Sequence, residues 1–213
     1  MVPWTMVLAD SFKPNFAFER SALKRNLGPV CGIDEAGCGP LAGPVVAAAV
    51  ILNRANVPKG INDSKRLTPE AREQLFGEIS ACALIGVGIA DVERIDRDNI
   101  LAARLWAMAQ AVANLAVAPA AALVDGDRAP TLSCTVKTIV CGDRRSLSIA
   151  AASIIAKVTR DRLMVALDGE YPDYGFAQHK GYGTAIHQAA LARLGPSPHH
   201  RRSFAPVRAA LPR

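Results

Sequence analysis

The chain has 213 residues, half of them hydrophobic, so it is long enough to fold as one medium domain with a full core. This composition excludes a disordered chain, and the longest apolar run, Val45 to Leu52, is far too short to span a membrane. The net charge of +6 favours nucleic acid or another anionic partner.

The five cysteines form an odd set, and most of them lie in apolar runs: Cys31, Cys38, Cys82, Cys134 and Cys141. This pattern predicts reduced thiols in a cytoplasmic protein, without a disulfide framework or a structural zinc site. Residues 1–28 mix charged and aromatic side chains and lack the apolar core of a signal peptide. We expect them to form a poorly ordered N-terminal extension.

The first half of the chain predicts three strands and two helices. Strands are expected over residues 30–35 and 45–52, joined by a tight connection rich in glycine and proline. A polar loop covers 62–66, and Thr68-Pro69-Glu70 is typical of a helix start, with Thr68 as the cap. A strand is expected over 83–90, followed by an alanine-rich helix over 100–118 that Pro119 ends.

The second half predicts two strands, over 121–125 and 136–140, and helices over 148–167 and 184–194. After Gly195 the chain is rich in Pro, His and Arg, and we expect it to pack loosely. This order indicates an α/β fold with helices flanking a mixed sheet.

Four carboxylates lie where apolar runs meet glycine: Asp34, Glu35, Asp125 and Asp143. Acids beside apolar segments are costly unless they are paired or bind a metal, and a divalent cation relieves the repulsion between converging acids. Since neighbouring residues of a strand point to opposite faces, Asp34 and Glu35 can share one site only if the strand ends or kinks there. The pattern favours a metal-dependent enzyme acting on a polyanion.

Each acid also has an ordinary interpretation when it is considered alone. Asp143 could cap a helix or form a turn, and Asp125 before Gly126 could be a turn former. The segment Gly37-x-Gly39-x-x-Ala42 also matches a loose dinucleotide-binding pattern. Pro40 would disrupt the helix that this pattern requires, and the two preceding acids would repel a pyrophosphate.

Several segments, in order, resemble the type 2 ribonuclease H family, bacterial ribonuclease HII. The first is residues 32–43, GIDEAGCGPLAG. The others are 62–65 (NDSK), 125–126, 142–143, 151–161 (AASIIAKVTRD), 174–182 (YGFAQHKGY) and 199–204 (HHRRSF), so the resemblance spans residues 30 to 207.

This resemblance implies a ribonuclease H-like catalytic domain over residues 29–170, with a small helical C-terminal portion and tail over 171–213. It also implies hydrolysis of RNA in RNA/DNA hybrids and incision 5′ of single ribonucleotides in duplex DNA, leaving 3′-hydroxyl and 5′-phosphate ends. The four carboxylates match the catalytic, metal-binding positions of the family, with Mg²⁺ or Mn²⁺ in a two-metal site. We expect a monomer.

The resemblance also implies residues that read the substrate. Backbone groups of Gly37, Cys38 and Gly39, together with Tyr182, match the positions that sense the ribose 2′-hydroxyl, the group that marks RNA. Further phosphate contacts are expected from Lys65, Ser153 and Lys157. Asp161 is expected to have a supporting role.

The sequence departs from the family pattern at Cys38, where the family usually has arginine. Cysteine cannot supply the forked, charged donors of a guanidinium. Sensing by backbone amides would survive this change, whereas affinity for the nucleic-acid backbone would fall unless another basic residue compensates. A reactive thiol at Cys38 is a further possibility.

Two other classes of function compete with this interpretation. A resolvase- or transposase-type nuclease would share the acids but lack the ribose-reading loop, and would still cut when the ribonucleotide is replaced by a deoxyribonucleotide. A nucleic-acid-binding module with structural acids would bind equally with and without magnesium and would give no product.

Overall fold

The structure is a computed structural model, and it describes residues 13–211. Its centre is a five-stranded mixed sheet in the order β3-β2-β1-β4-β5. Strand β1 pairs antiparallel with β2 and parallel with β4; β2–β3 is antiparallel and β4–β5 parallel. The strands are β1 (Val30–Ala36), β2 (Val45–Leu52), β3 (Ala83–Ala90), β4 (Ala121–Asp125) and β5 (Thr135–Ile139). The predicted α/β class with a mixed sheet is confirmed.

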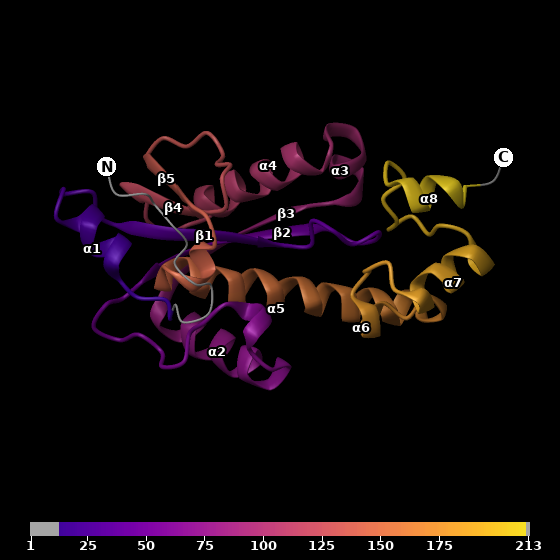
Figure 1. Ribbon diagram of the computed structural model, residues 1–213, viewed down its shortest axis with the longest axis horizontal. Helices are drawn as coiled ribbons and strands as arrows, with labels where there is room; N and C mark the ends of the chain where they lie inside the picture. The colour runs from indigo at the N-terminus through magenta and orange to yellow at the C-terminus, as the bar shows by residue number, and fades with distance from the viewer. Residues whose placement is uncertain (1–12, 212–213) are drawn as a thin grey trace, which may run out of the picture.

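Helices cover both faces of the sheet (Figure 1). Helix α5 (Leu147–Glu170) lies along one face beside α2 (Pro69–Cys82), and α4 (Ile100–Ala113) covers the other face beside α3 (Val92–Asp98). Strands β1 and β2 are therefore buried on both sides, which explains their nearly continuous apolar sequence.

Two glycines allow the helices to approach the strands closely. A Cβ on Gly88 of β3 would lie 2.0 Å from the carbonyl oxygen of Ala107 in α4. A Cβ on Gly32 of β1 would lie 2.1 Å from the backbone of Ser148 in α5. The second contact fixes the start of α5 against the strand that carries Asp34.

The C-terminal portion gathers at one end of the molecule, where α6 (Phe176–His179) packs against the end of α5, with α7 (Ala185–Leu194) and α8 (Ala205–Ala209) beyond it (Figure 1). The expectation of loose packing after Gly195 is wrong. His200 and Arg201 are 1% and 0% exposed, and His200 forms a β-bridge with Ala42. These residues are buried because they bind the backbone of the glycine-rich loop, which composition alone does not reveal.

The N-terminal region also differs from the expectation. Residues 17–23 form helix α1 (Ala17–Leu23), and its Glu19 is buried and bound to Ser146 and Ser148 at the start of α5. Residues 13–28 are thus part of the fold, whereas residues 1–12 of the predicted extension lie outside the described residues.

Smaller differences concern element boundaries. Helix α4 ends at Ala113, before the predicted stop at Pro119, and the Asn114 side chain donates to the carbonyl of Val87 instead. Helix α3 was not predicted. Short 3-10 turns lie over Ser64–Arg66 (η1) and Gly142–Arg144 (η2). No helix within residues 13–211 is both long and apolar enough to cross a membrane.

Candidate active site

Asp34 and Asp125 lie at corresponding positions on neighbouring parallel strands. The register pairs Ile33 with Val124, so the next residues along β1 and β4 are the two aspartates. Both follow apolar residues that the helices cover, at the carboxyl edge of this strand pair. Sites of α/β proteins gather at this edge of a sheet.

Glu35 points to the opposite face of the sheet from Asp34, because β1 continues through Ala36 without the expected end or kink. Its Oε1 atom lies 3.3 Å from Nη1 of Arg104 in α4 and 3.6 Å from Sγ of Cys38, whereas Oε2 is buried without a partner. The candidate site therefore includes side chains from both faces of the sheet at this edge.

Asp143 comes close to this edge through a contact between two loops. The backbone N–H of Gly142 donates to Oδ1 of Asp125 at 2.6 Å, which ties turn η2 to the end of β4. A Cβ on Gly142 would lie 2.6 Å from Ile149 and 3.2 Å from that same oxygen. Glycine before Asp143 thus permits the close approach that brings the acids together.

The carboxylates affect one another electrostatically. Burial raises the pKa of Asp34 well above its ordinary value, and the charges of Glu35, Asp125 and Asp143 raise it further. Burial also raises the pKa of Glu35, against the opposing charge of Arg104. For Asp143, burial and the charges of Asp63 and Asp125 raise the pKa to about 6. Asp34, Asp125 and Asp143 are therefore close enough for their negative charges to repel one another.

The chemistry of this donor set fits a hard divalent cation. All four side chains offer oxygen ligands, which Mg²⁺ and Mn²⁺ prefer, and Glu35 Oε2 is a buried acceptor without a partner. Within residues 13–211, no three Asp, Glu, His or Cys side chains are arranged closely enough to enclose an ion. Binding would therefore require the carboxylates to turn toward a common centre.

The loop of residues 62–66 places the positively charged side chain of Lys65 at this edge. Lys65 Nζ lies 4.0 Å from Oδ2 of Asp143, and its side chain is 80% exposed. Asp63, fully buried, accepts from the backbone N–H of Lys65 and from Nε of Arg144. Although burial acts to lower the pKa of Lys65, the charges of Asp34 and Asp143 raise it overall.

Ser153 lies beneath this loop and not at the surface. It is 3% exposed, its hydroxyl donates to the carbonyl of Ala150, and its oxygen accepts from the N–H of Ser64 at 3.3 Å. This position does not suit the direct phosphate contact expected from the sequence. Ser153 instead supports the turn that carries Lys65.

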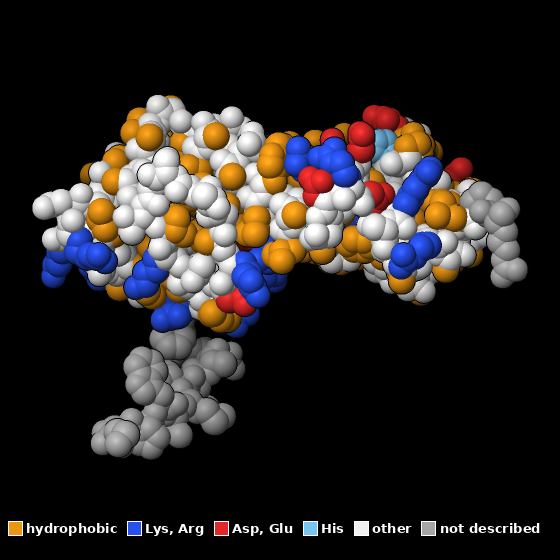
Figure 2. Space-filling view, turned by 90° about the horizontal axis from the view of Figure 1, so that it is seen from above, with side chains coloured by type: hydrophobic (Ala, Val, Ile, Leu, Met, Phe, Trp, Pro, Cys, Tyr) orange, Lys and Arg blue, Asp and Glu red, His pale blue; other side chains and the backbone are white. Residues whose placement is uncertain are grey.

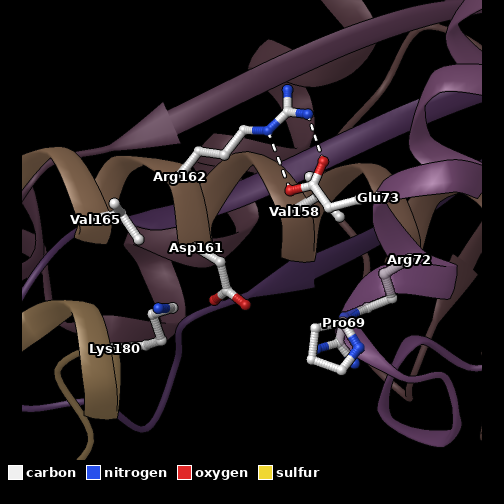
Figure 3. A pocket seen from close by; sticks show the side chains of 8 residues that line it. All are labelled: Pro69, Arg72, Glu73, Val158, Asp161, Arg162, Val165 and Lys180. Carbon is white, nitrogen blue, oxygen red and sulfur yellow. Dashed lines mark hydrogen bonds and ion pairs between the residues drawn. The ribbon is translucent and has the colours of Figure 1, made fainter.

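Lys157 and Tyr182 lie together, and their neighbours Asp161 and Lys180 line a surface cavity of about 380 Å³ between α5 and α2. The Nζ atom of Lys157 is 5.9 Å from the centre of the Tyr182 ring and 2.7 Å from Oδ1 of Asp161, so Asp161 is paired with Lys157. Figure 3 shows Asp161 projecting into this cavity near Lys180, while Arg162 turns away to pair with Glu73.

Two buried arginines hold the loop of residues 37–44. Arg201 donates to the carbonyls of Gly37, Cys38 and Gly43, and Arg160 to those of Ala42, Pro44 and Lys180. Gly37 has a φ of 98°, and a Cβ there would lie 2.1 Å from Arg160. Gly39 is exposed and Cys38 half-buried at the tip.

Sequence reasoning assigned no role to Arg104, Arg160 or Arg201. Arg160 and Arg201 lie within segments that resemble the family, but no local pattern distinguishes a buried arginine from a solvated one. The thiol of Cys38 is also not reactive in this environment, because burial and the charge of Glu35 raise its pKa to about 12.

The family model for ribonuclease HII matches residues 31–207. The chain belongs to the ribonuclease HII family. It is 58% identical over 195 residues to the ribonuclease HII of Azorhizobium caulinodans, covering 92% of this chain and 75% of that protein. It is 59% identical over 203 residues to the enzyme of Bradyrhizobium diazoefficiens, covering 95% and 77%. The chain is therefore a metal-dependent endoribonuclease that acts on RNA/DNA hybrids.

Solved structures share the fold. The crystal structure of ribonuclease H2 from Pyrococcus horikoshii superposes with a TM-score of 0.73 at 28% identity, covering 85% of this chain and 96% of that one. Ribonuclease HII of Archaeoglobus fulgidus, determined in complex with PCNA, gives 0.65 at 28% identity, covering 77% and 87%. Bst-RNase HIII in complex with Mn²⁺ gives 0.68 at 21% identity, covering 92% and 80%, a likeness of fold alone.

Proposed function

We propose that Asp34, Glu35, Asp125 and Asp143 are the catalytic, metal-binding residues of this endoribonuclease. The observation that carries the proposal is that acids from β1, β4 and η2 share one edge of the sheet and feel one another's charge. Each residue occupies a position that a catalytic acid of the resembling family takes. The donor set suits Mg²⁺ or Mn²⁺, and two ions would be bound.

Asp34, Glu35, Asp125 and Asp143 would hold the ions, which would supply an activated water and stabilisation of the leaving oxygen at the scissile phosphate. The protein orients the reactants. Arg104 restrains Oε1 of Glu35 and leaves Oε2 free, and the Gly142 N–H fixes one oxygen of Asp125. Lys65, with an exposed side chain, is placed to bind a phosphate next to Asp143.

We also propose that the enzyme incises 5′ of a single ribonucleotide in duplex DNA and leaves 3′-hydroxyl and 5′-phosphate ends. Backbone groups of Gly37, Cys38 and Gly39 would read the 2′-hydroxyl, together with Tyr182, whose side chain is exposed. Arg160 and Arg201 support this assignment because they bind the loop's carbonyls and so fix its backbone conformation.

Lys157, beside Tyr182, is proposed as a second phosphate contact, whereas Ser153 is assigned a supporting role under Lys65. On the face seen from above, most acidic side chains lie over the half with α3 and the C-terminal helices, whereas Lys and Arg are spread over both halves (Figure 2). We also propose that the protein is a cytoplasmic monomer. The catalytic domain would end at residue 170, where α5 ends, and the C-terminal portion would begin at residue 171.

The test is hydrolysis of an RNA/DNA hybrid with and without Mg²⁺ or Mn²⁺ by Asp34→Asn, Glu35→Gln, Asp125→Asn and Asp143→Asn. Each variant should lose turnover while still binding the hybrid, because chemistry and phosphate positioning use different residues. The matched control is Asp127→Asn, which changes an exposed acid two residues from Asp125. Full turnover in any of the four variants would remove that residue from the proposed site.

A further inference from the structure

Three histidines are buried together in the C-terminal portion, and the proposed function leaves them without a role. His179 of α6, His187 of α7 and His200 of the following loop are 7%, 0% and 1% exposed. The rings of His179 and His187 stack with centroids 4.2 Å apart, and His187 and His200 are joined by a hydrogen bond between their Nε2 atoms at 2.9 Å.

The hydrogen bonds of this cluster determine the protonation of each ring. Nδ1 of His200 accepts from the backbone N–H of Ser197, so His200 carries its proton on Nε2 and donates it to Nε2 of His187. His187 must then carry its proton on Nδ1, 2.9 Å from the carbonyl oxygen of Tyr182. A single chain of donors thus runs from Ser197 through two neutral rings to Tyr182.

His179 holds the same turn from its other side. Its Nδ1 accepts from the N–H of Gly181 at 3.1 Å, and its carbonyl accepts from the N–H of Tyr182 at 2.9 Å. Burial and the neighbouring histidine lower the pKa of His200 to about 4, and burial lowers the pKa of His187, so both rings stay neutral. This protonation preserves the one acceptor and one donor that each ring needs.

The turn held by the histidines also touches the glycine-rich loop. The N–H of Leu41 donates to the carbonyl of Gly181 at 2.8 Å, and the N–H of Gly43 to that of His199 at 2.9 Å. A Cβ on Gly181 would lie 2.4 Å from the carbonyl oxygen of Ala42, so no side chain separates the two segments. The position of Tyr182 relative to the loop therefore depends on backbone bonds that the histidines complete.

We propose that His187 and His200 are positioning residues that hold Tyr182 at the distance from the glycine-rich loop needed to engage a ribonucleotide. This rests on the proposed role of Tyr182 in substrate reading. His187 acts directly on the Tyr182 carbonyl, and His200 acts through His187. Neither ring contacts the substrate.

The test is a double-mutant cycle on cleavage of a DNA duplex with one embedded ribonucleotide, using His187→Phe, Tyr182→Ala and the pair. Phenylalanine keeps a ring against His179 but removes both hydrogen bonds. We expect His187→Phe to lower kcat/KM about tenfold or more, since small misplacement of a positioning group is costly. In the Tyr182→Ala background the same change should have almost no further effect.

Matched variants separate positioning from general destabilisation. His187→Asn places an amide N–H where Nδ1 donates to the Tyr182 carbonyl, and should lose less activity than His187→Phe. Tyr174→Phe removes one hydrogen bond, from its hydroxyl to the Gly195 carbonyl, in the same cluster but away from Tyr182. It should leave kcat/KM near that of the parent at temperatures where all variants are folded.

The outcomes distinguish the inference from the function it rests on. If the parent does not cut the ribonucleotide-containing duplex, the proposed function fails and the inference fails with it. If the parent cuts and His187→Phe cuts equally well, or its loss is additive with that of Tyr182→Ala, only the histidine proposal is overturned. If His187→Phe does not fold, His200→Phe, which removes the donor to His187, is measured by the same criteria.

Discussion

Replacing Arg201 with methionine removes the guanidinium that holds the glycine-rich loop. Arg201 is fully buried, and it donates from Nη1 to the Cys38 carbonyl, from Nη2 to Gly37, and from Nε and Nη2 to Gly43, at 2.6 to 3.0 Å. Methionine has a similar length and no donor. The change therefore tests the loop's hydrogen bonds with little change in volume.

The expected loss in the free energy of unfolding follows from the three carbonyls that would lose their hydrogen-bond donor. Leaving a buried acceptor unpaired costs about 1–3 kcal/mol, so three acceptors give about 3–9 kcal/mol. Part of this loss is offset, since burial and the charge of Arg160 lower the pKa of Arg201 to about 9, which shows that the buried charge is itself unfavourable. We expect Arg201→Met to reduce the free energy of unfolding by about 3–5 kcal/mol.

Urea unfolding of the metal-free protein measures this loss, and amide hydrogen exchange locates it. Exchange should rise first in residues 37–43. Arg202→Met is the matched control, because Arg202 is exposed and only its backbone N–H is bound, to Asp96. A loss below about 1 kcal/mol in Arg201→Met, or one equal to that of the control, would refute the reasoning.

Three further predictions concern other parts of the molecule. Cys38→Arg should tighten binding of the substrate duplex without moving the cleavage position; weaker binding or a shifted cut would contradict it. Glu19→Ala should lower the free energy of unfolding by about 2–4 kcal/mol, since the buried Glu19 Oε1 accepts from Ser146 Oγ and from the N–H and Oγ of Ser148. Exposed Arg20→Ala is its control, and equal losses in the two variants would count against this assignment. His200 contributes stability that is fully present above its ordinary pKa of 6.5 and is lost as the pH falls toward about 4, because the folded state resists protonation. The metal-free protein should lose up to about 3 kcal/mol through this group over that range, and His200→Phe should show a shallower slope in urea unfolding at matched pH; identical slopes would refute the assignment.

The main elements of the fold could be predicted from local patterns. Continuous apolar runs bounded by glycine indicated β1, β2 and β4, and Thr68-Pro69 indicated the start of α2, where the Thr68 side chain does accept from the N–H of Ala71. The order of strands and helices then restricted the fold to α/β. The candidate acids were found because carboxylates are unusual beside such runs.

Interactions between distant residues could not be predicted in the same way. The burial of Glu19, Arg160 and Arg201 depends on backbone groups that lie far away in the sequence; Arg201 and Gly43, for example, are 158 positions apart. The direction of the Glu35 side chain depends on the continuation of β1 through Ala36. The glycines that follow had suggested that the strand ends or kinks earlier. The local sequence around these residues carries no information about the distant groups that they contact.

Cleavage of a DNA duplex carrying one embedded ribonucleotide, with Mg²⁺, tests the central claim most directly. An all-DNA duplex and the Asp125→Asn variant serve as controls. The account predicts a single cut 5′ of the ribonucleotide, with 3′-hydroxyl and 5′-phosphate ends, and no cut in either control. Cleavage of the all-DNA duplex, a cut elsewhere, or no cut with either Mg²⁺ or Mn²⁺ would contradict it.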